Sequence, residues 1–231
     1  MSVHVTDEFI NSDFLIASDT VSPVATPTRT SRRREATRAR LVAAARELFA
    51  EQGFEPTRIN EITERADVGF GSFYNHFASK DAIVAAVIAT AVEEHGSAVD
   101  ALTADLEDPA EVVAVAHRYF VRLAGDDPIW AWLLVRLDLS HNVLSSALGE
   151  RAFRDLQAGL DAGRFTVASV PVALVGSGGA LVGVMRGVLD GAIPADRAGT
   201  DHAAGVLRLF GVPAADAAEV AERPLPPATR P

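Results

Sequence analysis

The chain has 231 residues, 48% of them hydrophobic and 23% charged, so it can bury a core as one large domain or as a small domain plus a larger one. It contains no cysteine, which excludes disulfides and thiolate metal sites and fits a reducing compartment. Asp7, Glu8 and Asp13 stand where a secretory signal peptide has basic residues, and no apolar run follows them. We therefore expect a cytoplasmic protein.

The net charge of −10 is divided unevenly along the chain. Residues 29–80 hold nine arginines and Lys80 against seven acids, a net charge of +3, which leaves about −13 for the rest. Local field matters more than total charge for nucleic-acid binding. Only this segment of the chain is therefore suited to approach phosphates.

The chain opens with a stretch rich in Ser, Thr, Pro and Asp, and we expect residues 1–28 to be a disordered tail. A basic run follows, made of Arg29, Arg32, Arg33 and Arg34. This run is either the solvated start of a helix or an arm that touches phosphate or reaches into a minor groove.

Four helices are expected between residues 37 and 95. The first covers 37–52, with Leu41, Leu48 and Phe49 at helical spacing, and ends at Gly53. Thr57 is expected to cap the second, residues 67–69 to form a turn, and residues 71–77 to form the third. Ser79 is expected to cap the fourth, which runs toward residues 93–95.

Beyond Gly96 the helical pattern continues without a convincing strand. Helices are expected at residues 109–124, 128–139, 141–161, 167–190 and 198–211, with Asp126-Asp127 starting the second of these. Residues 221–231 hold four of the twelve prolines and are expected to form a frayed tail. The prediction is an all-α protein of about nine helices.

The N-terminal pattern resembles the tetracycline-repressor (TetR) family of bacterial transcription regulators. The likeness lies in residues 48–54 (LFAEQGF), in the predicted Thr57 cap, and in residues 71–77 (GSFYNHF) followed by Lys80-Asp81. It covers about 45 residues and requires several features at fixed spacing. It implies a helix-turn-helix DNA-binding domain at 29–80 and a ligand-binding and dimerisation domain at 81–220.

The third helix carries the side chains suited to a DNA groove. Asn75 is the best candidate for reading an adenine edge, Ser72 can donate or accept at several bases, and Phe70 can contact a thymine methyl. The resemblance implies phosphate contacts for Tyr74, His76, Thr57 and Lys80. The full predicted DNA-binding set is Arg33, Arg34, Thr57, Gly69, Phe70, Ser72, Tyr74, Asn75, His76 and Lys80.

Two residues depart from the family pattern. Asp67 stands where the family usually has glycine, and Gly69 stands where it has serine or a similar small polar residue. The operator preference therefore cannot be taken from relatives.

Residues 165–185 run for 21 residues without a charge, a length that reaches the threshold for a membrane span. Pro171, several glycines and the flanking Arg164 and Arg186 argue against a span and favour a buried helix at a subunit interface. A homodimer also makes physical sense, because two-fold pairing doubles the DNA contacts of one short recognition helix. The predicted homodimer interface is Leu174, Gly178, Leu181, Val182, Met185, Leu207 and Phe210.

Aromatic and basic residues gather in the middle helices. His117, Phe120, Trp130, Trp132 and Arg136 are the predicted contacts for a small-molecule effector, because aromatics with a few polar groups line such pockets. The alternative is that they simply form the domain core.

Enzyme chemistry finds little support. The six histidines show no metal-binding spacing, no GxSxG elbow occurs, and residues 176–179 lack the preceding strand and following lysine of a phosphate loop. We expect no cofactor and no metal. The prediction is a ligand-released transcription repressor that binds double-stranded operator DNA; the alternatives are an activator, a nucleoid-type binder, or a helical lipid-binding protein or enzyme without DNA binding.

Overall fold

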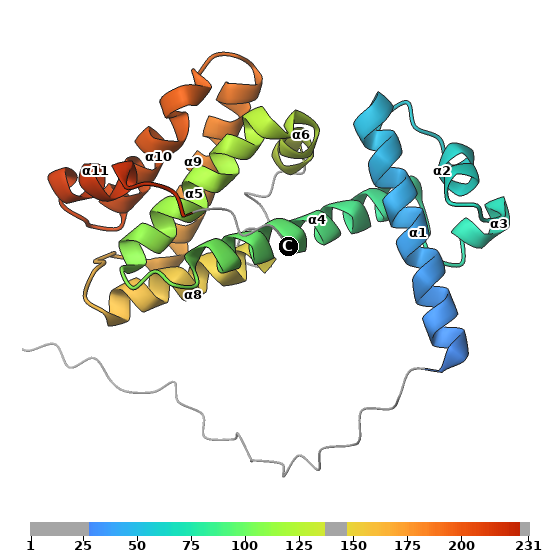
Figure 1. Cartoon of the computed structure of the whole chain (residues 1–231), viewed down its shortest axis with the longest axis horizontal. Coiled ribbons are helices and arrows are strands. Elements are labelled where there is room, and N and C mark those ends of the chain that lie inside the picture. The colour runs from blue at the N-terminus through green and yellow to red at the C-terminus, as the bar shows by residue number, and fades with distance from the viewer. Residues whose placement is uncertain (1–27, 137–146, 227–231) are drawn as a thin grey trace, which may run out of the picture.

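The computed structural model describes residues 28–136 and 147–226, and within these ranges it contains ten α-helices and no strand (Figure 1). The all-α prediction is confirmed. The helices are α1 (Arg29–Gln52), α2 (Ile59–Arg65), α3 (Phe70–Phe73), α4 (Lys80–Thr103), α5 (Pro109–Asp126), α6 (Pro128–Arg136), α8 (Ala147–Asp161), α9 (Val170–Leu189), α10 (Ala195–Leu209) and α11 (Ala214–Glu222).

A small bundle of α1, α2 and α3 stands at one end of the molecule, and α4 runs from it along the underside of a larger helical body (Figure 1). Phe49, Ile62 and Phe73 are completely or almost completely buried in the bundle, and Ile83 of α4 joins them. The rings of Phe73 and Phe77 lie 5.7 Å apart, as their four-residue spacing predicts. Because α4 contributes to both parts, it can transmit a displacement between them.

In the larger body α5 is the central helix and packs against α4, α6, α8, α9, α10 and α11. A second apolar core joins α5, α8, α9, α10 and α11. The last helix, α11, is held by ion pairs from Arg223 to Glu111 and from Arg164 to Asp216. The prediction that a frayed tail starts at residue 221 is therefore wrong, because α11 extends to Glu222 and Arg223 is fixed against α5.

Several predicted helix ends are confirmed. Ser79 Oγ accepts from Ala82 N at 3.2 Å, Asp127 Oδ1 accepts from Trp130 N at 3.1 Å, and Gly53 ends α1 with a φ of +81°. The first helix begins earlier than predicted, at Arg29, where the Thr28 hydroxyl accepts from Ser31 N. The basic run is thus the first two turns of α1.

The predicted cap at Thr57 is wrong. Its hydroxyl donates to the carbonyl of Gly53 at 2.6 Å, and Arg58 is the residue that precedes α2. Helix α3 is also shorter than expected: it ends at Phe73, and Tyr74 to His76 continue as a turn in which Asn75 N donates to the carbonyl of Ser72. The three-residue span of that bond marks the tighter winding common at helix ends.

Two helices, α4 and α9, are long and apolar enough to cross a membrane by length and composition. Half of the most apolar 18-residue stretch of α4 is buried inside the protein, whereas only 22% of the corresponding stretch of α9 is buried. One face of α9 is therefore apolar and exposed.

Candidate DNA interface and ligand cavity

The residues around α3 form an exposed aromatic and polar ridge. Phe70 and Tyr74 each keep 53% of their surface exposed, and Asn75 is exposed between Tyr74 and the partly buried His76. Both exposed rings are braced by aromatic contacts: Tyr74 lies edge-on to Phe70 at 5.8 Å and to the buried Phe73 at 5.4 Å. This bracing reduces the rotamer freedom that DNA binding would otherwise remove.

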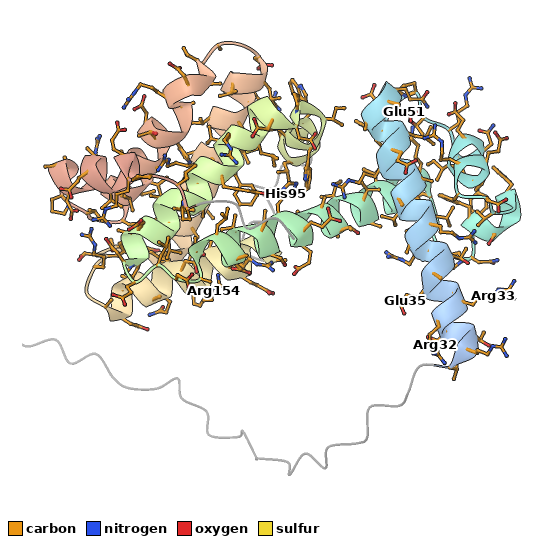
Figure 2. The ribbon with its side chains drawn as sticks, viewed as in Figure 1. Arg32, Arg33, Glu35, Glu51, His95 and Arg154 are labelled. Carbon is orange, nitrogen blue, oxygen red and sulfur yellow. The ribbon has the colours of Figure 1, made fainter. Side chains whose placement is uncertain are left out.

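The arginines at the start of α1 lie beside this ridge. Arg34 Nη2 donates to the carbonyl of Asn75 at 3.3 Å, although 41 residues separate them. An open hollow between the two segments is lined by Thr30, Arg33, Arg34, Thr37, Ser72, Asn75 and His76. Figure 2 shows Arg33 on the side of α1 that faces α3, whereas Glu35 projects to the other side. The hollow is thus cationic and adjoins the ridge.

Two predicted phosphate contacts are engaged inside the protein. Thr57 is only 1% exposed, so its side chain cannot reach a phosphate, and that assignment is wrong. Lys80 Nζ donates to the carbonyl of Glu55 at 2.8 Å, which leaves two of its three N–H groups for another acceptor. Partial burial and the charges of Arg34 and Arg38 lower the pKa of His76, so the ring is neutral at pH 7.

The turn before α3 explains one departure from the family pattern. Asp67 has a φ of +52°, the left-handed region that glycine adopts freely and that aspartate tolerates better than most residues. Its carboxylate is exposed, and α3 is preceded directly by Gly69, so Asp67 does not cap α3.

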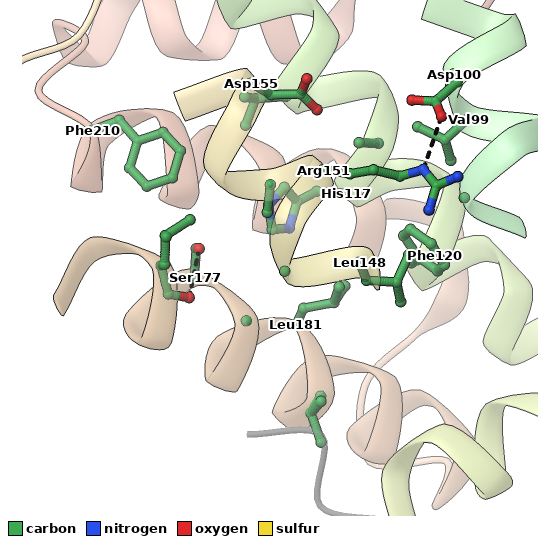
Figure 3. Close-up of a pocket in the computed structure, with 18 residues that line it drawn as sticks. Val99, Asp100, His117, Phe120, Leu148, Arg151, Asp155, Ser177, Leu181 and Phe210 are labelled. Carbon is green, nitrogen blue, oxygen red and sulfur yellow. Dashed lines mark hydrogen bonds and ion pairs between the residues drawn. The ribbon is translucent and has the colours of Figure 1, made fainter. Parts of the chain in front are cut away.

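A cavity of about 120 Å³ lies in the larger body, between α4, α5, α8, α9 and the end of α10 (Figure 3). Its wall is mostly apolar and includes Val99, Phe120, Leu148, Leu181 and Phe210. Polar side chains come from four helices: Asp100 from α4, His117 from α5, Arg151 and Asp155 from α8, and Ser177 from α9. An engineered apolar cavity of about 150 Å³ binds benzene, so this somewhat smaller space has the scale of a single ring.

Arg151 is held over α4 by two carboxylates. Its Nε donates to Asp100 Oδ2 at 2.8 Å and its Nη2 to Glu93 Oε1 at 2.8 Å. Gly96 makes this approach possible, because a Cβ there would lie 2.8 Å from the guanidinium carbon of Arg151. Arg154 extends the cluster, with Nη2 on Asp100 Oδ1 at 2.7 Å and Nε on Asp155 Oδ1 at 3.0 Å.

The two carboxylates of the cavity differ in proton affinity. Burial acts to raise the pKa of Asp100, but hydrogen bonds from Arg151 and Arg154 outweigh it and bring the pKa below its usual value. The pKa of Asp155 is raised, chiefly by burial, which the hydrogen bond from Arg154 only partly offsets. Asp155 therefore binds a proton more readily than Asp100 does.

His117 reaches the cavity from α5 and is bonded behind to α10. Its Nδ1 lies 3.0 Å from His202 Nε2 in a hydrogen bond between the two rings. Burial lowers the pKa of His117 to about 3 and that of His202 to about 4. Both rings are neutral at pH 7, so one of them donates the shared proton and the other accepts it.

The other predicted effector contacts lie elsewhere. Trp130 is buried beside His95 of α4, with ring centres 5.1 Å apart, and Trp132 lies at a hollow next to the end of α1 with Arg186 over its ring. Neither tryptophan lines the cavity beside His117, because α6 lies on the side of the larger body that faces the bundle of α1, α2 and α3 (Figure 1). The side chain of Arg136 lies outside the described residues.

Four of the predicted dimer residues, Leu174, Met185, Leu207 and Phe210, are buried within the chain, which corrects the prediction for them, whereas Gly178, Leu181 and Val182 are only half-buried. Leu174, Gly178, Leu181, Val182 and Phe210 line the cavity, and Met185 and Leu207 are at most 1% exposed in the core. Helix α9 is apolar on all sides, so its sequence does not reveal which face turns inward. The exposed large hydrophobics of this region are Val172 and Val175 of α9, Phe153 of α8 and Leu209 of α10.

Sequence reasoning missed Asp100, Arg151 and Asp155. Arg151 and Asp155 are four residues apart and so share a helix face, a detectable signal, but such pairs are usually solvated. Asp100 joins them only through tertiary packing. Within the described residues, no group of three or more His, Cys, Asp or Glu side chains is placed to hold a metal ion.

Comparison with known proteins assigns both parts of the chain. Residues 41–87 match the family model for bacterial regulatory proteins of the tetR family, and residues 108–223 match the tetracyclin repressor-like C-terminal domain. The crystal structure of RolR in complex with resorcinol is 41% identical, with a TM-score of 0.76, over 86% of this chain and 99% of RolR. RolR without ligand gives 40% identity and a TM-score of 0.73 over 83% of this chain and all of RolR.

The curated relatives match over shorter stretches. UidR of Escherichia coli is 40% identical over 22% of this chain and 26% of its own length, and TcmR of Streptomyces glaucescens is 33% identical over 44% and 46%. The chain thus spans about a quarter of UidR and less than half of TcmR. UidR and TcmR are both named as HTH-type transcriptional regulators, which together with the family matches confirms the prediction of a transcription regulator. The chain belongs to the TetR family of bacterial transcription regulators.

Proposed function

We propose that two copies of this protein bind operator DNA together as a repressor, and that a small hydroxylated aromatic compound releases them from the DNA. The DNA contacts are Phe70, Ser72, Tyr74 and Asn75 at the ridge, with Gly69 allowing the backbone to approach. Arg33, Arg34, His76 and Lys80 supply backbone contacts around them. Supporting this assignment, the hollow beside the ridge is lined by two arginines and no carboxylate.

The observation that carries the ligand proposal is the cavity itself. Its volume suits one ring, its apolar wall suits an aromatic face, and Asp100, Arg151, Asp155 and His117 offer both donors and acceptors for hydroxyl groups. RolR, which resembles this chain over nearly its whole length, was crystallised with resorcinol, a benzene ring with two hydroxyls. A dihydroxybenzene is therefore the ligand class proposed here.

The exposed apolar face of α8, α9 and α10 supports a homodimer. Val172 is 69% exposed and Phe153, Val175 and Leu209 between 43% and 49%, and a Cβ on Gly176 would lie 3.4 Å from Leu209. Small residues at 176, 179, 180 and 183 would let a second copy of α9 approach closely. Burying this face between two copies would remove it from water and pair the two recognition ridges for successive major grooves.

Helix α4 is the proposed link between ligand and DNA. Its first turns pack in the core with α1, and its later residues Gly96, Val99 and Asp100 border the cavity. A ligand that shifts Asp100 or Arg151 would tilt α4 and change the spacing of the two ridges. Release follows if the ligand favours the conformation whose spacing no longer matches DNA.

Operator selection followed by calorimetry tests this function. Selection from random duplex DNA is expected to yield a two-fold symmetric site, and titration with resorcinol to give saturable binding. The Arg151→Gln variant is expected to weaken resorcinol binding at least tenfold while retaining operator binding. Arg122→Gln, an exposed change on the outside of α5, is the matched control. Saturable binding unaffected by Arg151→Gln would place the ligand outside this cavity.

A further inference from the structure

The arginine at the wall of the cavity has its charge already matched by carboxylates. Arg151 is the only arginine or lysine among the described residues that line this space. It makes four hydrogen bonds: Nε donates to Asp100 at 2.8 Å, Nη1 to Glu93 at 3.2 Å and to the Ala147 carbonyl at 3.4 Å, and Nη2 to Glu93 at 2.8 Å. A guanidinium has five N–H groups. One N–H is therefore left for a ligand hydroxyl, whereas the positive charge already faces two carboxylates.

The neighbouring cation, Arg154, is bonded to the same group of carboxylates. Its Nη2 donates to Asp100 and its Nε to Asp155, and its side chain is 57% exposed and does not line the cavity. With Glu93 included, two arginines stand against three acidic side chains, a formal net charge of −1. An incoming anion would therefore meet, among the described residues of this wall, no cation without a carboxylate partner.

The other polar groups of the described wall carry no charge at neutral pH. Burial lowers the pKa of His117 to about 3, so its ring offers hydrogen bonds but no positive charge. The Ser177 hydroxyl donates to the carbonyl of Leu174, and the remaining side chains of the described wall are apolar. Moving an anion from water into such a space is unfavourable unless a cation compensates it, and nearby carboxylates add repulsion.

The charge of Asp155 is less compensated than that of Asp100. The side chain of Asp155 is 15% exposed and accepts one hydrogen bond from an arginine, whereas Asp100 accepts from both Arg151 and Arg154. The raised pKa of Asp155 and the lowered pKa of Asp100 agree with this difference. A second negative charge in the cavity would therefore be opposed most strongly by Asp155.

We propose that the cavity admits a hydroxylated one-ring compound only in its uncharged form, and that Asp155 is the residue that rejects phenolates and aromatic carboxylates. The inference rests on the proposed ligand-binding function and extends it to the ionisation state of the ligand. A phenol hydroxyl can donate to Asp155 and accept from the remaining N–H of Arg151. A phenolate has no proton to donate, and its charge repels the carboxylate.

Two small phenols test this selection by calorimetric titration of the full chain between pH 6 and pH 8.5. Phenol, like the tyrosine ring, stays uncharged over this range, whereas 2,6-difluorophenol is of nearly the same size and ionises near neutral pH. The affinity for 2,6-difluorophenol relative to phenol is expected to fall about tenfold for each pH unit above the pKa of the probe, because only the uncharged fraction binds. A relative affinity that does not change with pH would overturn the proposal.

The variant Asp155→Asn tests the residue, because the amide keeps the shape of the side chain and removes its charge. At pH 8.5 this variant is expected to bind 2,6-difluorophenol at least about tenfold more tightly than the wild type does. Asp161→Asn is the matched control: it removes one acidic charge from the exposed end of α8, outside the lining of the cavity, and should behave as the wild type. The same pH dependence in Asp155→Asn and the wild type would overturn the assignment to Asp155.

Resorcinol separates this proposal from the ligand class. If resorcinol binds and releases the operator while the relative affinity for 2,6-difluorophenol does not change with pH, the proposed function stands and the charge selection is wrong. If resorcinol does not bind but the two phenols bind with the expected pH dependence, the dihydroxybenzene class is wrong and the charge selection stands.

Discussion

Arg34 and Asn75 are joined by a hydrogen bond from the guanidinium Nη2 to the backbone carbonyl, at 3.3 Å. The first turns of α1 are thereby attached to the C-terminal end of the recognition ridge. The basic run and Asn75, predicted separately from the sequence, therefore lie on one surface.

Arg34→Ala is expected to lower the affinity for operator and for random duplex DNA alike, by about tenfold at moderate salt, since a phosphate contact carries no sequence information. The slope of log K against log salt is expected to fall by about one. Fluorescence anisotropy over a salt series measures both. Arg122→Ala, on the outside of α5, is the control that should leave both values unchanged. An unchanged slope in Arg34→Ala would exclude the first turns of α1 from the DNA interface.

Asn75 and Tyr74 are expected to differ in what they contribute. Asn75→Ala is expected to cost about 1–3 kcal/mol on the operator and little on random DNA, because it removes a base contact. Tyr74→Phe removes only a hydroxyl and is expected to weaken both duplexes equally. If Asn75→Ala lowered the affinity for the two duplexes equally, Asn75 would not read a base.

Gly159 of α8 is expected to tolerate no side chain. A Cβ there would lie 1.9 Å from Cδ2 of Phe165, which is buried against Phe210. Gly159→Ala is expected to destabilise the fold by about 1–3 kcal/mol and to lower Tm by roughly 2–12 °C. Gly125→Ala is the matched control, since no atom lies within 4 Å of its added Cβ and helical alanine is favoured over glycine. Equal melting curves for the two variants would contradict the packing described.

Stability is expected to fall as pH drops below about 6.5, the ordinary pKa of histidine. The folded pKa values of His117 and His202, about 3 and about 4, lie below it. The unfolded chain therefore binds more protons between these limits, so stabilisation is complete above pH 6.5 and is lost as pH falls toward 4.

Thermal melts at pH 7, 6 and 5 test this prediction. The double variant His117→Gln, His202→Gln is expected to show a smaller decrease of Tm over this range than the wild type. The pKa values of His95 and His76 are also lowered, so part of the decrease should remain. A decrease of the same size in the double variant would rule out the pair as its source.

Val175→Glu is expected to convert a dimer into monomers, because it places a charge in the middle of the exposed face of α9. Sedimentation velocity measures the change. Ala39→Glu, a charge added on an exposed position of α1, should sediment as the wild type does. A dimer that survives Val175→Glu would move the interface away from α9.

The sequence predicted best what depends on local chemistry. Helix ends at Gly53, Ser79 and Asp127 are confirmed because each is set by a side chain or a backbone conformation within a few residues. The predicted cap at Thr57 was wrong because the hydroxyl has two possible local hydrogen-bond partners, and it donates to the Gly53 carbonyl instead of capping α2. Helix α11 was missed because its apolar side is mostly alanine, with Ala217, Val220 and Ala221 carrying the packing.

Long-range relationships were harder to predict. Helix α9 is apolar on every side, so its inward and outward faces are decided by partners rather than by periodicity. Asp100 and Arg151 resemble solvated charges until α8 is laid against α4, where Gly96 admits the guanidinium. His117 was identified from its aromatic neighbourhood, but its partner His202 is 85 residues away and carries no local signal.

The most direct test is anisotropy of a labelled operator duplex, taken from selection, titrated with the protein in the presence and absence of resorcinol. We expect tight, sequence-selective binding that falls steeply with salt, and release of the duplex by resorcinol. Random duplex should bind weakly under the same conditions. Selective binding that no concentration of resorcinol changes would contradict ligand control by this class of compound, and equal weak binding to both duplexes would contradict the DNA interface itself.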